Sequence, residues 1–129
     1  MKILKFDVLD STSTYARENA STLPLPSLII ADTQIHGRGR RGNSFYSPEN
    51  TGLYMTLLFE CEEPVPLITP AAAVTVCKII EKHFGVHPKI KWVNDVYVSE
   101  MKLSGILTEG EMADGRLRYA IVGIGINTH

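Results

Sequence analysis

Short runs of apolar and β-branched residues recur along the chain, separated by polar, glycine-containing or proline-containing segments. Such runs are typical of β-strands. They predict strands over residues 2–8, 27–33, 52–60, 89–92, 96–98, 102–108 and 116–126. Asp114 and Gly115 form a turn before the last run, and an Asp-Gly pair between apolar runs is typical of a hairpin. We therefore expect the last two strands to be antiparallel neighbours.

A first helix is predicted soon after the first strand. Serine and threonine side chains at 11–14 are good N-caps for a helix over residues 15–20. Pro24 and Pro26 end this helix, because proline has no N–H to donate and its ring clashes with the preceding turn. The segment therefore predicts a strand followed by a short helix.

A second helix is predicted before Gly85, which is a typical C-terminal stop. Thr69 is its expected N-cap, and Pro70 suits its first turn. Its apolar residues recur at spacings of three and four: Ala73, Val76, Cys77, Ile80 and Phe84.

These elements predict an α+β fold with a mixed, largely antiparallel sheet and helices packed on one face. The 129 residues fit one domain, and no internal repeat or low-complexity linker divides them. Apolar residues at 44% and charged residues at 21% are ordinary globular values. The net charge of −1 provides no global basic field, so binding of nucleic acid or an acidic membrane through overall charge is not expected.

The chain has no stretch of about 20 apolar residues to cross a bilayer and no signal peptide at its start, so a cytoplasmic location is the default expectation. Cys61 and Cys77 lack a metal-binding spacing and are expected to be reduced and structural. The histidines show no paired spacing, and no serine has a convincing base partner. A hydrolase triad is therefore unsupported.

The segment 37–42, Gly-Arg-Gly-Arg-Arg-Gly, is a candidate anion site. Glycines let backbone N–H groups approach a ligand, and arginines add forked, fixed positive charges suited to carboxylate or phosphate. A solvated surface loop is the alternative interpretation. The letters also match G-x-G-x-x-G, but no helix or βαβ unit follows, so the match is weak evidence for a dinucleotide site.

Charged residues around Asn94 and Asp95 form a second candidate. Lys91 and Lys102 flank this pair, an arrangement suited to orienting a phosphate, Mg²⁺ or an incoming amine. An ordinary hairpin turn is the alternative. Trp92, between these residues, is expected in the core because its ring has a large apolar area to bury.

Two further segments are candidates for ligand contacts: a cluster of hydroxyl side chains near the start of the chain and a pair of glycines in the last predicted strand. The hydroxyl cluster at 11–14 either caps the first helix or fixes a neutral polar ligand such as a urea or amide. Gly123 and Gly125 alternate along the last strand, which clears one face for an adenine or a sugar. A bulge or a close backbone approach is the alternative for these glycines.

Taken together and in order, these tracts resemble the catalytic domain of biotin protein ligases, a class II synthetase-like core. The resemblance covers nearly the whole chain. It rests on the hydroxyl cluster, Gln34 with the Gly-Arg tract, the Lys-Trp-Val-Asn-Asp segment over 91–95, the Lys-Leu-Ser-Gly-Ile-Leu segment over 102–107, and Gly-Ile-Gly-Ile-Asn over 123–127.

The resemblance implies that biotin and ATP react to form biotinyl-5′-AMP, with Mg²⁺, before a carrier-protein lysine displaces AMP. Matched positions imply a catalytic set of Arg40, Lys102 and Asp95, with Asp95 also the residue for Mg²⁺. They imply a biotin set of Ser11, Thr12, Ser13, Gln34, Gly37, Arg38, Gly39, Arg40, Lys102 and Gly105. They imply an ATP set of Arg38, Arg40, Asn94, Gly123, Gly125 and Asn127. Phe45 is expected to cover the loop and protect the reactive adenylate from water.

The chain departs from the family pattern at two positions, with Val93 in place of proline and Ser13 in place of asparagine. It is expected to form one catalytic domain over 1–129, without the usual C-terminal continuation or an N-terminal DNA-binding domain. Expected partners are biotin, ATP and a biotin carboxyl carrier domain, with no DNA and no membrane. Two further partners stay open: a second copy of the chain in a homodimer, and a complementing C-terminal piece.

Two other functions stay open from the residues alone: a non-catalytic biotin-binding or partner-binding remnant, and a lipoate protein ligase. Residues 36–45 are expected to be poorly ordered without ligand, because ordering a glycine-rich loop costs backbone entropy.

Overall fold

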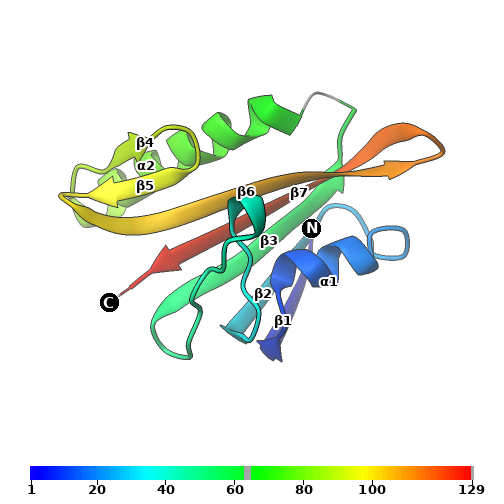
Figure 1. The fold of residues 1–129 in the computed structure, drawn as a ribbon, viewed down its shortest axis with the longest axis horizontal. Coiled ribbons are helices and arrows are strands. Elements are labelled where there is room, and N and C mark those ends of the chain that lie inside the picture. The colour runs from blue at the N-terminus through cyan, green and yellow to red at the C-terminus, as the bar shows by residue number, and fades with distance from the viewer. Residues whose placement is uncertain (63–64, 129) are drawn as a thin grey trace.

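The structure is a computed structural model that describes residues 1–62 and 65–128. In this part of the chain, seven strands form one sheet in the order β1-β2-β3-β7-β6-β5-β4. β1 and β2 are parallel, and every other neighbouring pair is antiparallel. The predicted α+β class and mixed, largely antiparallel sheet are therefore confirmed (Figure 1).

The strands lie close to the predicted positions. Their bounds are β1 Lys2–Leu9, β2 Ser27–Gln34, β3 Gly52–Glu60, β4 Lys89–Lys91, β5 Asp95–Val98, β6 Met101–Ala113 and β7 Arg116–Asn127. β6 continues well beyond residue 108 because it stays paired with β7 as far as Ala113 opposite Arg116. Asp114 and Gly115 both have positive φ, 54° and 76°, as a two-residue hairpin turn requires. The predicted hairpin is therefore confirmed.

The helices α1 (Thr12–Glu18) and α2 (Ile68–Phe84) begin earlier than predicted. Ser11 caps α1 by accepting a hydrogen bond from Thr14 N at 3.3 Å. Thr69 is not the N-cap of α2, because the 3₁₀ turn Val65–Leu67 leads directly into the helix. Gly85 ends α2 in the left-handed conformation, as predicted. Neither of these helices, nor any other in the described residues, is long and apolar enough to span a bilayer.

The expectation that both helices pack on one face is wrong, because they cover opposite faces of the sheet. Adjacent residues of a strand point to opposite faces. Leu58 and Ile121 pack in one core cluster with Ala16 of α1. Leu57 and Val122 pack in the other cluster, with residues of α2. Both helices can therefore bury an apolar side on the same central strands.

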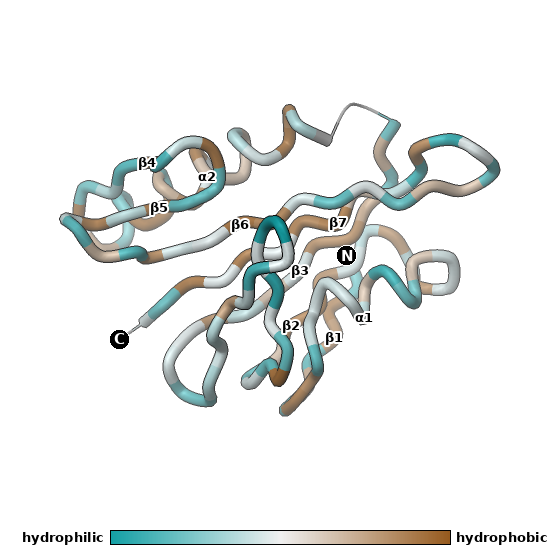
Figure 2. The backbone as a smooth tube through the Cα atoms, in the orientation of Figure 1, coloured by the Kyte–Doolittle hydropathy of each residue, from teal (hydrophilic) through white to brown (hydrophobic). Residues whose placement is uncertain are grey.

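Hydrophobic residues dominate the middle of β3 and β7, whereas the turn at Arg40–Gly42 is hydrophilic (Figure 2). This 3₁₀ turn lies over the α1 face of the sheet, which also carries Gly123 and Gly125. The α2 face of the sheet carries the buried Ile106 of β6 and Val122 of β7. Beside the loop, the sheet thus has an apolar core on the α2 side and room for a polar site on the α1 side, next to the apolar cluster that α1 itself covers.

The two cysteines are not joined in a disulfide. Burial, and secondarily the carboxylate of Glu81, raises the pKa of the Cys77 thiol above its ordinary value. A raised pKa disfavours the reactive thiolate. Cys77 therefore fits the expected structural role.

Candidate functional site

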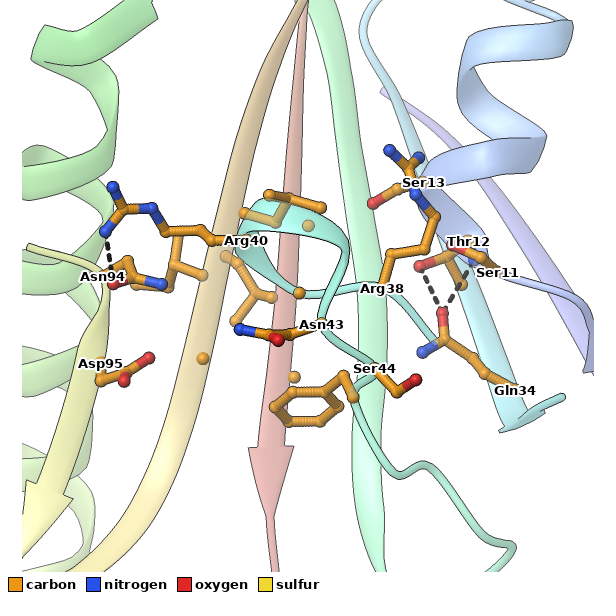
Figure 3. A pocket seen from close by; sticks show the side chains of 18 of the residues that line it. Ser11, Thr12, Ser13, Gln34, Arg38, Arg40, Asn43, Ser44, Asn94 and Asp95 are labelled. Atoms are coloured by element: carbon orange, nitrogen blue, oxygen red, sulfur yellow. Dashed lines mark hydrogen bonds between the residues drawn. The ribbon is translucent and has the colours of Figure 1, made fainter. Parts of the chain in front are cut away.

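A cavity of about 430 Å³ lies between the start of α1, the Gly-Arg loop and the ends of β4 to β7 (Figure 3). Its lining comes from segments that are far apart in the sequence. Those residues are Ser11, Thr12, Ser13, Gln34, Arg38, Gly39, Arg40, Arg41, Asn43, Ser44, Phe45, Met55, Trp92, Asn94, Asp95, Lys102, Gly105, Ile106, Leu107, Gly123, Ile124 and Gly125.

One side of the cavity is a network of neutral polar side chains at the start of α1. Gln34 Oε1 accepts hydrogen bonds from Thr12 N at 2.8 Å and from Thr12 Oγ1 at 3.1 Å. Thr56 Oγ1 lies 2.7 Å from Thr12 Oγ1 and 2.9 Å from Ser13 Oγ. Thr12, Ser13 and Thr56 are all buried. This side therefore presents donors and acceptors without a net charge, which suits a neutral polar group.

The Gly-Arg loop is folded back on itself above the cavity. Gly39 N donates to Asn43 O at 2.7 Å, and Phe45 N donates to Gly37 O at 2.8 Å. The sequence led us to expect backbone N–H groups of this loop at the ligand. The Gly39 N–H is already engaged inside the loop, so it is not available to a ligand in this conformation. The arginine side chains of the loop, which line the cavity, supply hydrogen-bond donors in its place.

The base of the loop is fastened to the neutral polar side. Gln34 Nε2 donates to Ser47 Oγ at 3.0 Å, and Ser47 Oγ donates to Phe45 O at 2.8 Å. Gly37 packs tightly here, since an added Cβ would lie 2.6 Å from Ser47 Oγ and 2.9 Å from Gln34 Nε2. The loop and the network on α1 are therefore parts of one connected structure.

The opposite side of the cavity is charged. Arg40 Nη1 donates to Asn94 Oδ1 at 3.2 Å, which joins the loop to the β4–β5 hairpin. Lys102 Nζ lies 3.2 Å from Asp95 Oδ1, in an ion pair that lacks hydrogen-bond alignment. Arg40 and Lys102, which the sequence assigned to the same pocket, therefore both line it.

Trp92 does not belong to the core, contrary to the prediction. It is 79% exposed and lines the cavity beside Arg40. The turn that separates β4 from β5 contains Trp92 and Asn94, and a turn between short edge strands projects its side chains away from the sheet. Asn94 lies in this turn and Asp95 begins β5, and both line the cavity, so a hairpin turn and a place in the site are compatible for this segment.

The floor of the cavity is made by glycines beneath Phe45. Added Cβ atoms at Gly105 and Gly125 would overlap the Phe45 ring, at 2.9 Å from Cε2 and 2.5 Å from Cζ respectively. An added Cβ at Gly123 would lie 2.5 Å from Ser13 Oγ. The alternating glycines therefore make room for the side chains of Ser13 and Phe45, and the close backbone approach given as the alternative is not what occupies this face. Lys102 Nζ lies 5.7 Å from the centre of the same Phe45 ring, within cation–π range.

Most of the expected site residues line this cavity. Two expected residues, both in the described part of the chain, lie outside its lining: Gly37, which supports the loop from behind, and Asn127, whose Nδ2 donates to Lys102 O at 3.1 Å. The sequence analysis missed Thr56, although a polar residue inside the apolar run 52–60 was a usable signal. Asn43, Ser44 and Met55 were also missed, and their types carry no distinctive signal.

Among the described residues, no group of three His, Cys, Asp or Glu side chains comes together as a ready-made metal site. Asp95 is a single carboxylate on the cavity, and its Oδ1 has no hydrogen-bond partner among the described residues. Mg²⁺ is usually held by one or two carboxylates together with substrate phosphates. Asp95 therefore fits Mg²⁺ that arrives with a nucleotide.

The fold and the cavity define a site for a ligand with a neutral polar end and an anionic end. In agreement, residues 5–127 match the biotin/lipoate A/B protein ligase family. The chain belongs to this family.

The chain is similar to proteins from several bacteria. The bifunctional ligase/repressor BirA of Bacillus subtilis (strain 168) is 39% identical over 131 residues, covering 98% of this chain and 40% of the relative. The structure of biotin protein ligase from Aquifex aeolicus in complex with biotin and ATP matches with a TM-score of 0.79 and 31% identity, over 97% of this chain and 51% of that one. Biotin acetyl coenzyme A carboxylase synthetase from Helicobacter pylori with bound biotinylated ATP matches with a TM-score of 0.77 and 29% identity, over 99% and 61%. The chain thus spans about 40% of the Bacillus relative and 51% to 61% of these two structures.

Proposed function

We propose that this chain acts in biotin protein ligation, forming biotinyl-5′-AMP from biotin and ATP and transferring biotin to a lysine of a carrier protein. The observation that carries the proposal is the meeting of Arg40 and Lys102 in one cavity with the neutral network of α1. The Aquifex relative has been seen with biotin and ATP, and it shares the fold of this chain.

The neutral side of the cavity suits the ureido ring of biotin. A urea has two N–H donors and a carbonyl acceptor. Hydroxyls both donate and accept, so Ser11, Thr12 and Ser13, with Gln34, are able to satisfy both kinds of group. Thr56 contacts Thr12 and Ser13, and Thr12 donates to Gln34, so the positions of Thr12, Ser13 and Gln34 are set before a ligand enters.

The charged side suits the reacting end of biotin. In the first step a biotin carboxylate oxygen attacks the α-phosphorus of ATP, the bond to the β-phosphate breaks and pyrophosphate leaves, and the mutual repulsion of the two anions opposes the reaction. Arg38, Arg40 and Lys102 all line the cavity, so their charges are in position to stabilise the negative charge that develops. We assign Arg40 and Lys102, with Asp95, as the catalytic set.

Nucleotide binding is assigned to Arg38, Arg40 and Asn94, and to Gly123, Gly125 and Asn127 on β7. Asp95 would hold Mg²⁺, which supplies positive charge to the phosphate oxygens. The Phe45 ring occupies the space that a Cβ on Gly125 would need. A nucleotide contact at that point therefore requires Phe45 to move with the loop.

In the second step an acceptor lysine amine attacks the carbonyl of biotinyl-5′-AMP, and AMP leaves. We propose a biotin carboxyl carrier domain as the acceptor and the cytoplasm as the place of action, without a part for DNA. Since Asp95 lies beside Lys102, it is also placed to receive an ammonium group near the reacting atoms.

Biotin-dependent exchange of labelled pyrophosphate into ATP tests the proposal, because exchange requires adenylate formation and its reversal. The expected result is exchange with biotin and ATP together and none when biotin is replaced by its neutral carboxamide. Calorimetric binding of biotin without exchange would instead establish a binding remnant. Tighter binding of lipoate than of biotin would favour a lipoate ligase.

A further inference from the structure

A cluster of four charged residues lies behind the Gly-Arg loop, where it joins α1 and β6 to the loop. Arg38 Nη2 donates to Glu109 Oε2 at 2.6 Å. Arg17 Nη2 lies 2.9 Å from the same oxygen, and Arg17 Nε lies 3.4 Å from Glu111 Oε2. Glu109 and Glu111 are two residues apart on β6, so both point to the face that α1 covers.

Glu109 is the least exposed member of the cluster. Its side chain is 17% exposed, compared with 36% for Arg38, 38% for Arg17 and 34% for Glu111. Its Oε1 has no hydrogen-bond partner among the described residues, so both arginines meet at Oε2. A carboxylate this far removed from water is costly unless it is paired, which favours keeping both arginines in place.

The contact with Glu109 leaves most of the Arg38 guanidinium available. A guanidinium has five N–H donors in a rigid plane, and the bond to Glu109 engages only the terminal nitrogen Nη2. Arg38 also lines the cavity. Anchoring one corner of a planar group limits the directions in which its other donors can point.

Arg17 changes the electrostatic outcome of this contact. A single Arg38–Glu109 pair would have no net charge and would attract an anion weakly. Because Arg17 shares the same carboxylate oxygen, the three residues together carry a net charge of +1. Glu111 would bring the whole cluster to neutrality, but it pairs with Arg17 and is more exposed than Glu109, so water screens its charge better.

We infer that Glu109 is a positioning residue for Arg38: it orients the guanidinium toward an anionic group in the cavity, while Arg17 holds Glu109 and preserves the positive charge. The inference rests on the proposed function and extends it to residues outside the cavity lining. The ligand class is a carboxylate, and its reactive end is the part that Arg38 meets.

The test compares the affinity for biotin with the affinity for biotin carboxamide by calorimetry. The two ligands differ in charge only at the end that Arg38 is proposed to meet. The protein is expected to prefer biotin, and Glu109→Ala is expected to reduce the biotin affinity roughly tenfold with little change for the carboxamide. Glu109→Gln, which keeps an acceptor for Arg38, should recover part of the preference.

Three comparisons isolate the positioning role. Glu111→Gln is the matched control, from the same strand and face, and should change neither affinity by more than about twofold. Adding Glu109→Ala to Arg38→Ala should cause no further loss of preference, since the first residue acts through the second. If Glu109→Ala does not fold, Glu109→Asp replaces it in the test. Aspartate keeps the negative charge but is one methylene shorter, so the carboxylate lies farther from Arg38. This variant should also lower the preference for biotin over the carboxamide.

A Glu109 variant that folds and retains the full preference would overturn the inference, and so would an equal loss of affinity for both ligands. An effect of Glu111→Gln as large as that of Glu109→Ala would also overturn it. If the unmodified protein bound neither ligand, the proposed biotin site itself would fail, and the inference would fail with it. The unmodified protein therefore separates the two kinds of failure.

Discussion

The two faces of the central strands differ in what they present to their surroundings. Toward α2, β6 and β7 present Ile106, Val122 and Ile124, which pack with apolar residues of the helix. Toward α1 and the loop, the same strands present Gly105, Gly123 and Gly125. Beside the loop, one face is therefore filled by its own side chains, whereas the other is left for side chains supplied by other segments; further along β7, Ile121 fills the α1 face as well.

This difference separates stability from binding. Burial of large apolar side chains is the main favourable contribution to folding, and it is strongest where packing is dense. The cavity side has polar and charged groups whose hydrogen bonds and ion pairs each contribute little net stability. We therefore expect substitutions on the α2 face to change the free energy of unfolding, and substitutions on the cavity face to change ligand affinity.

Removal of a core side chain on α2 should have the largest effect on stability. Ile80 is 9% exposed and belongs to the α2 core. Ile80→Ala should lower the free energy of unfolding by about 2–5 kcal/mol, because it leaves a cavity. Urea denaturation measures the loss, and calorimetry under folding conditions should show unchanged biotin affinity. An affinity loss of similar size would mean that the two faces are coupled.

Removal of a cavity charge should have the next largest effect, on ligand affinity and catalysis. Lys102→Ala and Arg40→Ala each remove a charge-assisted contact of about 1.5–3 kcal/mol, or roughly ten- to a hundredfold. Lys102→Ala should depress pyrophosphate exchange more than biotin binding, and Arg40→Ala should speed adenylate dissociation. Lys91→Ala is a suitable control, because Lys91 contacts Tyr97 at the edge of the sheet. Unchanged exchange in both cavity variants would contradict the assignment.

An added methyl group beneath the loop should sharpen the comparison further. Gly125→Ala places a Cβ in the Phe45 ring, so the ring must shift, at a cost of about 1–3 kcal/mol. The stability cost should largely disappear when Phe45→Ala is already present, which a double-mutant cycle in urea denaturation measures. Costs that simply add would show that the Phe45 ring does not pack on Gly125.

The smallest expected effect is on local order in the loop. Residues 36–45 should gain protection from hydrogen exchange when biotin binds, since ordering each residue costs about 1–2 kcal/mol that a ligand contact offsets. The turn at Asp114 and Gly115 serves as an internal control, because it lies outside the cavity lining. Equal protection of both segments would indicate a global effect instead of closure of the loop.

Much of the secondary structure follows from local chemistry. The span of β3, the positive-φ turn at Asp114 and Gly115, and the left-handed stop at Gly85 agree with the sequence because each depends on residues next to one another. The alternation of glycine and isoleucine at the end of β7 likewise specifies one open face and one apolar face, since strand side chains point alternately to opposite sides.

The spatial partners of these residues depend on the tertiary structure. A run of apolar residues predicts burial but does not say which face of a sheet will bury it, so the opposite placement of α1 and α2 was not predictable. Trp92 is apolar by composition but exposed by its position in a turn between edge strands.

The sequence by itself determined most of the helices and strands, their order, and the motifs by which the chain resembles the ligase family. Secondary structure depends on periodicity, and the resemblance depends on short motifs, so both can be found without the tertiary structure. Only the tertiary structure decided that Arg38 meets Glu109, that Thr56 joins Thr12 to Ser13, and that Phe45 fills the space above Gly125. Each of these contacts joins segments far apart in the chain, and their geometry is set by strand register and packing that no local pattern encodes.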